Sequence, residues 1–329
     1  MDQIWALAAE NILSPIILSF ALGVAAALAR SDLTIPEAAA KAMSIYLLFA
    51  IGFKGGVSVA DHGVDLTLGL SLLAGGILSL VLPFVAFYLL SVLSTLSRVD
   101  AGAVAAHYGS ISIVTFVAGT SVLQSGGIIY DGYMVAVAAV MEAPAILSAL
   151  WLISRVGDGN GSARRMDGEL WREILLNGSI VLLVGSFLIG WATGQDGMER
   201  ISPFIVAPFQ GVLCLFLLDM GLVAGRGLRG GGKVLQPGVL AFGILMPLIG
   251  SGVGLAFGLL LGVGTGSVAL FMVLAASASY IAVPAAMRVA LPEANPSIYL
   301  TLSLGVTFPF NLTLGLPIYV AVASALTGG

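Results

Sequence analysis

Charged side chains are scarce in this chain. Asp, Glu, Lys and Arg make up 9% of its 329 residues, whereas 59% of the residues are hydrophobic and the mean hydropathy is +1.07. So high an apolar content is not typical of a soluble core, so most of the chain must lie in lipid. The net charge is -4, and the loops include both positively and negatively charged ones. This distribution gives no support for nucleic-acid binding. The sequence therefore predicts an all-α polytopic membrane protein.

Cysteine and histidine are also rare. Cys214 is the only cysteine, which excludes an internal disulfide and a thiolate metal cluster and favours a packing role. His107 and Ser110 share one short stretch, but no acidic residue or second histidine accompanies them at the spacing of a catalytic relay or metal site. We therefore expect no enzyme and no organic cofactor. A basic n-region is missing before the first hydrophobic stretch, which indicates a retained span rather than a cleaved signal.

Hydrophobic stretches long enough to cross a bilayer recur along the whole chain. They predict ten spans, at about 13–29, 38–60, 67–93, 101–124, 130–154, 173–194, 202–226, 237–262, 266–290 and 297–326. Five spans precede a soluble-looking stretch and five follow it. We expect a first five-helix repeat over 1–154, a cytoplasmic linker over 155–171 and a second five-helix repeat over 172–329.

Lys and Arg are distributed unevenly between the two sides of the membrane. If the loops alternate between sides, eleven of these residues fall on one side and only Arg200 falls on the other, with Lys54 left inside a span. The basic side is expected to be cytoplasmic, which places both termini outside. Because each half has an odd number of spans, any repeat between the halves must be inverted.

Local similarities support such a repeat. The segment Ile51–Gly56 in span two resembles Met220–Gly225 in span seven, and Pro144 and Pro309 stand among small and polar residues in spans five and ten. Spans four and nine are each interrupted by a serine-bearing segment, 109–116 and 277–284. Paired interruptions at corresponding positions of two halves are typical of the binding site of a secondary transporter.

Each interruption contains two serines that are two residues apart: Ser110 with Ser112, and Ser277 with Ser279. On an intact helix this spacing directs the two hydroxyls to nearly opposite faces. Both can line one cavity only if the helix opens there, and Gly109 and Pro284 are expected to loosen the helix. The alternative is that these serines bond back to the preceding turn or join neighbouring helices.

A broken span provides two kinds of binding group. The N-terminal end of one half-helix suits an anion, while freed carbonyls and nearby hydroxyls suit sodium. The oxygen-bearing side chains expected to bind sodium are Ser112, Thr115, Glu142, Ser279, Thr307 and Asn311. Thr307 and Asn311 share a helix face near Pro309 and are expected to reach the same cavity as Glu142.

Ionisable residues inside spans cost roughly 2.5 to 3.5 kcal/mol on insertion scales and need an explanation. Glu142 is interpreted as a sodium ligand or proton carrier, or else as a structural acceptor for freed N–H groups. Lys54 and Asp219 occupy equivalent spans, so we expect an ion pair with a structural or a coupling role. His107 is interpreted as a proton carrier or pH sensor, or as a histidine hydrogen-bonded in place.

The residues also carry a family resemblance, strongest from Val273 to Leu326. It runs through Ala275-Ala276-Ser277-Ala278-Ser279, Pro284, Arg288, Pro292, Ala294-Asn295-Pro296-Ser297, Pro309, Gly315 and Pro317. It extends more loosely to Ser14-Pro15, Ile35-Pro36-Glu37-Ala38, Gly109, Ser112, Thr115 and Glu142-Ala143-Pro144-Ala145. These segments resemble the sodium-dependent bicarbonate transporters first known from cyanobacteria.

The resemblance implies two inverted repeats, crossed broken helices in spans four and nine, core and gate domains, and a homotrimer in the bacterial inner (plasma) membrane. It implies sodium-coupled uptake of bicarbonate by an elevator mechanism, with substrate at positions matching Gly109, Ser110, Ser112, Ser277 and Ser279, and at Ala278 between the last two. The chain departs from its relatives at Tyr280, where they carry an acidic residue, and at Lys54 and Asp219. Its short middle loop argues against docking of the small signalling protein that regulates those relatives.

Other functions remain open from the sequence. A small carboxylate is the main alternative substrate, and a proton-coupled or antiporting carrier is the main alternative mechanism, based on Glu142, His107 and the Lys54 and Asp219 pair. An intramembrane enzyme or a channel fits less well, because an inverted repeat with a central site indicates a carrier.

Overall fold

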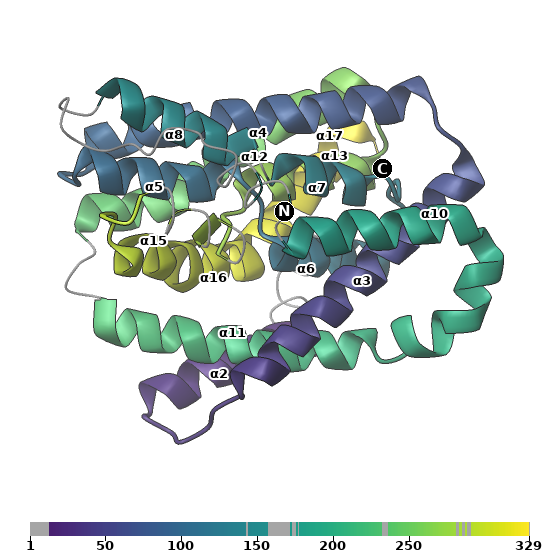
Figure 1. The fold of residues 1–329 in the computed structure, drawn as a ribbon, viewed down its shortest axis with the longest axis horizontal. Helices are drawn as coiled ribbons and strands as arrows, with labels where there is room; N and C mark the ends of the chain where they lie inside the picture. Colours follow the sequence, from purple (N-terminus) through teal and green to yellow (C-terminus); the bar gives the residue numbers. More distant parts are fainter. Residues whose placement is uncertain are drawn as a thin grey trace.

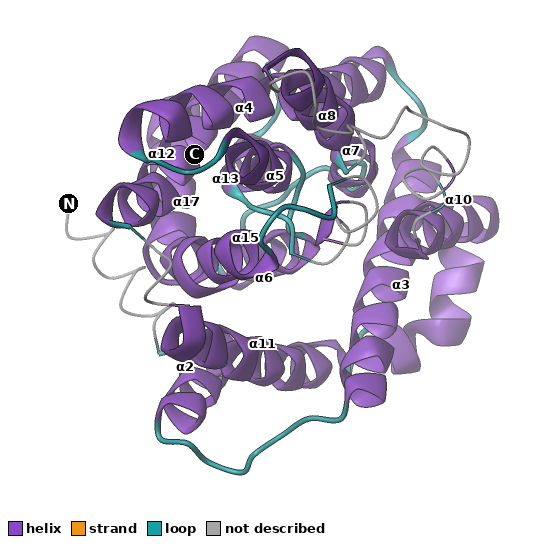
Figure 2. Cartoon of the chain, turned by 60° about the vertical axis from the view of Figure 1, so that its left-hand side comes forward, coloured by secondary structure: helices purple, strands orange, loops and turns teal. Residues whose placement is uncertain are grey.

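The computed structural model describes residues 13–142, 144–156, 172, 176, 178–231, 236–280, 283–284, 287 and 291–328. Within these residues every regular element is a helix (Figures 1 and 2). Eight helical stretches there are long and apolar enough to cross a membrane. Two shorter apolar helices, Pro15–Leu28 and Thr265–Ala276, coincide with the two remaining expected spans. The polytopic all-helical class is confirmed, whereas the layout of ten spans in two repeats stays a prediction.

Some sequence predictions fall on other parts of the chain. Most of the linker expected over 155–171 lies outside the described residues, as do residue 143 and much of the second half of the span expected over 266–290.

Four helices form one group along the lower side of Figure 1. They are α2 (Pro15–Leu28), α3 (Glu37–His62), α10 (Gly178–Ile205) and α11 (Phe209–Gly231). Helix α3 packs along α10, and α2 packs along α11. Glycines permit both approaches: a Cβ on Gly56 would lie 1.9 Å from the Phe187 carbonyl oxygen, and one on Gly221 would lie 2.2 Å from that of Phe20. Small residues at such contacts let helix backbones pack closely in a membrane.

The remaining helices form a second group around the two interrupted spans. They are α4 (Leu66–Leu93), α5 (Arg98–Gly109), α6 (Ile113–Ser125), α7 (Met134–Met141), α8 (Pro144–Val156), α12 (Pro237–Leu261), α13 (Thr265–Ala276), α15 (Pro296–Leu302), α16 (Phe308–Phe310) and α17 (Leu316–Thr327). Figure 2 shows α5 and α13 near the centre of this group, ringed by the others. The interrupted spans therefore lie where protein rather than lipid surrounds them, as irregular backbone at membrane depth requires.

The sixth span ends differently from its sequence prediction. Helix α10 contains Gly194 with φ 55° and ψ -148°, a left-handed conformation that glycine adopts readily, so the chain kinks and a second helical piece continues to Ile205. The seventh span, expected from residue 202, therefore begins only at Phe209. The predicted end of the span at residue 194 coincides with this kink, because the apolar run stops there and Gln195 and Asp196 follow it, but the second helical piece was not predicted.

Loops that the alternation of spans assigns to one side are bonded to each other. The Asn295 main-chain nitrogen donates to the Asp100 carboxylate at 2.8 Å on the expected cytoplasmic side. At the other end, the hydroxyl of Ser267 donates to the Asp131 carboxylate at 2.7 Å. These contacts agree with the predicted alternation of loops.

Candidate functional site

The first interruption opens the helix between α5 and α6. Helix α5 ends at Gly109, and Ser110 and Ser112 adopt extended backbone conformations before α6 begins at Ile113. The Ser112 hydroxyl caps α6, because its oxygen accepts from the Thr115 main-chain nitrogen at 3.2 Å and from the Thr115 hydroxyl at 3.0 Å. The opening predicted from the serine spacing is present.

Gly109 is the last residue of α5 and lies directly before the opening, as expected, and it also has a packing role. A Cβ at this position would lie 2.3 Å from the ring of Pro83 and 2.9 Å from the Cβ of Ala145. The glycine is needed because α4 and α8 pack directly against the end of α5.

The second interruption follows α13, which ends at Ala276. The Ser277 hydroxyl donates back to the Leu274 carbonyl at 2.9 Å, and the Ser279 hydroxyl accepts from the Val283 main-chain nitrogen at 3.4 Å. Residues 277–280 are not helical, and Pro284 comes after the opening instead of causing it.

The two interruptions contact each other directly. The Ser112 main-chain nitrogen donates to the Ser277 hydroxyl at 2.9 Å, and the Ser279 main-chain nitrogen donates to the His107 carbonyl at 2.7 Å. The N-terminal end of α6 therefore lies beside the C-terminal end of α13. The positive N-terminal end of α6 and the carbonyl end of α13 therefore meet in one small volume.

The tenth expected span supports this crossing through two π-helical turns on either side of Pro309, Ser303–Thr307 and Asn311–Gly315. The Asn311 amide donates to the Ala276 carbonyl at 2.8 Å, and it accepts from the Tyr319 hydroxyl. Such wide turns often mark functional sites in helices.

Thr307 also lies near the first interruption. Its hydroxyl donates to the Gly243 carbonyl at 2.6 Å and is bonded to the hydroxyl of Tyr108, which precedes Gly109. Sequence reasoning missed Tyr108 and Tyr319. For Tyr108, its place directly before the interruption was an available signal.

Several buried polar atoms near the crossing have no partner. Among the described residues five buried side-chain atoms lack a hydrogen bond, and four belong to the interruptions or their neighbours: His107 Nε2, Ser110 Oγ, Glu142 Oε2 and Tyr280 OH. An unsatisfied buried polar atom costs about 1–3 kcal/mol, so its presence needs an explanation. A bound ion or a small polar substrate at the crossing would supply the missing partners.

Glu142 lies in the gap between α7 and α8, with 4% of its surface exposed. The backbone freed there is already satisfied by Ser79, whose hydroxyl donates to the Met141 carbonyl at 2.6 Å and accepts from the Ala145 nitrogen at 3.1 Å. A capping role for the Glu142 carboxylate is therefore unnecessary. Ala145, three residues after Glu142, lies against Gly109 at the end of α5.

His107 is fixed on one side only. Its Nδ1 lies 2.6 Å from the Ala103 carbonyl, and its ring stacks on Tyr299 with the centroids 4.4 Å apart. The Nε2 atom is the unpartnered one. The ring is thus held in place by its own helix and by α15, while one nitrogen remains for another partner.

The expected ion pair between Lys54 and Asp219 does not form among the described residues. The Lys54 ammonium instead lies 4.4 Å from the ring centroid of Phe209, at the start of α11. Asp219 stands ten residues further along α11, which is roughly 15 Å at 1.5 Å per residue. Equivalent positions in a repeat share a backbone environment, but they need not face each other.

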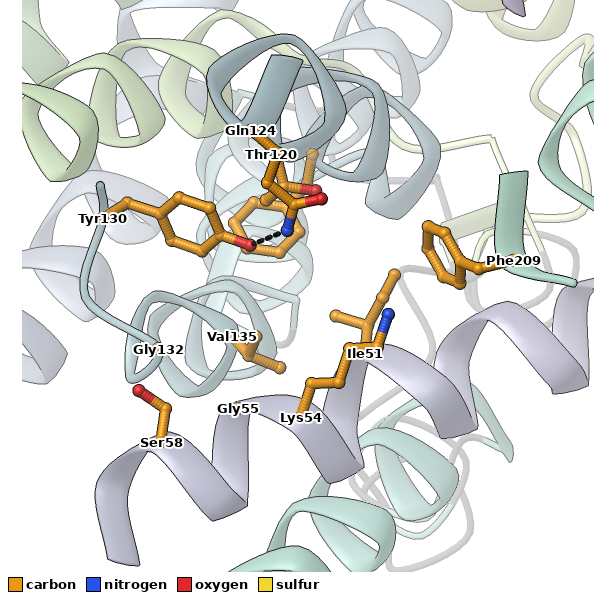
Figure 3. A pocket seen from close by; sticks show the side chains of 11 residues that line it. Ile51, Lys54, Gly55, Ser58, Thr120, Gln124, Tyr130, Gly132, Val135 and Phe209 are labelled. Atoms are coloured by element: carbon orange, nitrogen blue, oxygen red, sulfur yellow. Dashed lines mark hydrogen bonds between the residues drawn. The ribbon is translucent and has the colours of Figure 1, made fainter. Parts of the chain in front are cut away.

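Two pockets flank the crossing. The Lys54 pocket, of about 190 Å³, lies among α3, α6, α7 and Phe209 (Figure 3). The Tyr280 pocket, of about 720 Å³, lies among α11, α15, the first π-helical turn and Tyr280. The sequence similarity of Ile51–Gly56 to Met220–Gly225 aligns residues that line the two pockets. The aligned pairs are Ile51 with Met220, Lys54 with Val223, Gly55 with Ala224 and, one helical turn further, Ser58 with Gly227. Under the predicted repeat, the pockets would occupy matching positions in the two halves.

Comparison with known families identifies the chain. Residues 15–324 match the family described as the Na+-dependent bicarbonate transporter superfamily. The chain belongs to this superfamily. No curated protein matches the chain. Membership confirms the resemblance drawn from the sequence, and with the apolar helices it makes the protein a multi-pass membrane transporter of a sodium-dependent class.

Within this member of the superfamily, most of the predicted site residues come together. The crossing brings together Gly109, Ser110, Ser112, Thr115, Ser277, Ala278 and Ser279. Asn311 is connected to the crossing by its hydrogen bond to the Ala276 carbonyl, and Thr307 is connected to it by its hydrogen bond to Tyr108. Glu142 is linked to it by packing alone, and Lys54 and Asp219 stand apart from it.

Proposed function

We propose that the protein couples sodium to the uptake of a small anion, bicarbonate first, at the crossing of the two interrupted spans. The observation that carries this proposal is the direct contact of the interruptions through Ser112 and Ser277, beside buried polar atoms that lack partners. Main-chain N–H groups at the start of α6 suit the anion, and hydroxyl and carbonyl oxygens at the end of α13 suit sodium.

The sodium ligands proposed are the oxygen-bearing residues around the crossing. Ser112, Thr115 and Ser279 are buried there; the hydroxyl oxygens of Ser112 and Ser279 accept hydrogen bonds from main-chain nitrogens, and the Thr115 hydroxyl donates to that of Ser112. Glu142 would add a negative charge, and Thr307 and Asn311 complete the set from the tenth span. The anion is proposed to lie at Gly109, Ser110, Ser112, Ser277, Ala278 and Ser279.

Transport is proposed to follow an elevator mechanism. Helices α2, α3, α10 and α11 would form the gate domain, and the helices around the crossing would form the moving core. Matching pockets of unequal size, about 190 Å³ and 720 Å³, support this arrangement. The larger one lies by the loops expected to be cytoplasmic, so this conformation is interpreted as inward-facing.

The test is uptake of labelled bicarbonate into proteoliposomes at a pH where dissolved carbon dioxide is minor. An inward sodium gradient should drive accumulation, and replacing sodium with potassium at equal ionic strength should stop it. Uptake that is indifferent to sodium would overturn the proposal. A small carboxylate offered in competition distinguishes the two candidate substrates.

A proton-coupled carrier is the second candidate, because Glu142 and His107 each keep one buried atom without a partner. Under that mechanism an imposed pH gradient would drive uptake without sodium, and Glu142→Gln would abolish it. The superfamily resemblance also favours a homotrimer in the bacterial inner membrane, which cross-linking of purified protein in detergent would test. The uneven distribution of Lys and Arg favours both termini outside, which protease access to intact cells would test.

A further inference from the structure

Lys54 is a half-buried cation within a membrane span that no acidic side chain neutralises in its pocket. The described lining of the Lys54 pocket contains no Asp or Glu, and the ammonium rests over the ring of Phe209 at 4.4 Å. A cation–π contact recovers less free energy than a charged residue costs at the centre of a span. A stable fold gains little from this lysine, so its charge calls for a ligand.

The pocket around Lys54 is lined by neutral hydrogen-bonding groups. Figure 3 shows Lys54 reaching from α3 into the space between Phe209 and the side chains of Thr120, Gln124 and Tyr130. The Gln124 amide donates to the Tyr130 hydroxyl at 3.0 Å. Because this hydroxyl accepts from Gln124, its own proton can be donated elsewhere. An ammonium, an amide and a phenol that converge on one cavity match the needs of a small oxyanion.

The matching position in the other half lacks this chemistry. Val223 occupies the place of Lys54 in the Tyr280 pocket, and Gly227 occupies the place of Ser58. If Lys54 served only the packing of the repeat, a similar residue would be expected in both halves. The charge is present in one pocket only, on the side expected to face outside.

We propose that the Lys54 pocket is a second anion-binding site, separate from the helix crossing, which captures the substrate oxyanion from outside before it moves to the crossing. This rests on the proposed function for the identity of the anion, but not for the existence of the site. Lys54 supplies the charge, and Tyr130 and Gln124 supply hydrogen bonds. The site attracts small anions and repels cations of similar size.

The first experiment measures bicarbonate entry at saturating sodium with the full-length protein in right-side-out vesicles. Lys54→Gln keeps the length of the side chain without its charge, and should raise the KM for bicarbonate roughly ten-fold with Vmax and the KM for sodium little changed. Lys54→Arg should restore most of the affinity. Lys41→Gln, an exposed lysine on the same helix, is the matched control and should change nothing. An unchanged KM in Lys54→Gln overturns the proposal.

The second experiment does not depend on transport. Gln124→Cys in a Cys214→Ala background places one thiol at the exposed rim of the pocket. An anionic thiol reagent should react faster than a cationic one of the same size, and Lys54→Gln should lower the ratio of the two rates by roughly ten-fold. A ratio that Lys54→Gln leaves unaltered refutes the anion site. If wild-type protein moves no bicarbonate while the ratio changes as expected, the proposed function fails and the anion site stands.

Discussion

Ser277→Ala tests the contact that holds the two interruptions together. The Ser277 hydroxyl, 1% exposed, accepts from the Ser112 main-chain nitrogen and donates to the Leu274 carbonyl, each at 2.9 Å. Alanine fills almost the same space, so no large cavity forms. The change leaves the buried N–H of Ser112 without a partner, which costs about 1–3 kcal/mol.

This cost acts on the conformation that binds ligand. If sodium and bicarbonate need the assembled crossing, a penalty of about 1–3 kcal/mol lowers the population of the competent state and weakens both apparent affinities by roughly 5- to 150-fold. Uptake kinetics in proteoliposomes should show a higher KM for both ions. Thermal unfolding in detergent should show a lower Tm that high sodium and bicarbonate partly restore.

Ser251→Ala is the matched control. Ser251 is also buried in a helix and donates to the carbonyl three residues earlier, Leu248, at 2.8 Å, but no hydrogen bond to its hydroxyl from another element is present in the described structure. Removing this hydroxyl should leave both KM values unchanged. Equal KM values for Ser277→Ala and wild type, or equal losses in the two variants, would refute the reasoning.

Three further predictions concern neighbouring residues. Gly109→Ala should lower the free energy of unfolding by about 1–3 kcal/mol because its Cβ would meet Pro83 at 2.3 Å, whereas Gly119→Ala, with its nearest contact at 3.3 Å, should cost much less in the same thermal unfolding assay. Glu142→Gln should keep the fold but raise the KM for sodium at least ten-fold; an unchanged sodium KM removes Glu142 from the ligand set. Tyr280→Phe should change Tm little, since the Tyr280 hydroxyl makes no hydrogen bond in the described structure and has the Ser112 hydroxyl near it, while the KM for bicarbonate rises; an unaltered KM shows that this hydroxyl does not contact the anion.

The sequence was most informative where a local pattern conflicted with a continuous helix. Ser110 and Ser112, like Ser277 and Ser279, could serve one cavity only from an open backbone, and the structure opens at both pairs. Hydropathy located the spans because lipid requires a minimum apolar length. These inferences depend on residues that are close in the sequence and on the lipid around the helices, so the sequence alone is sufficient to make them.

Contacts between distant segments could not be predicted in this way. The partner of Lys54 is an aromatic ring at the start of α11, and the carbonyl near Glu142 is satisfied by a serine in α4. The two π-helical turns beside Pro309 also have no signature that separates them from a kinked α-helix in sequence. Each of these features depends on which helices pack together, and the same series of apolar spans is compatible with many packing arrangements.

The pairing of the two pockets suggests why the halves share backbone features but not side chains. An inverted repeat gives a carrier two similar routes, one to each side, and sodium rather than asymmetry supplies the direction of net transport. Side chains can still set how tightly each route holds the anion. If the proposed repeat and anion site hold, Lys54 would give the outer route a charge that helps to capture a dilute anion, whereas Val223 would give the matching inner position none, so the anion would be held less tightly where it must leave. Placing a lysine at Val223 should therefore slow release on the inside, and Val223→Lys with a lowered Vmax for entry and an unchanged Tm would support this account; an unchanged Vmax would contradict it.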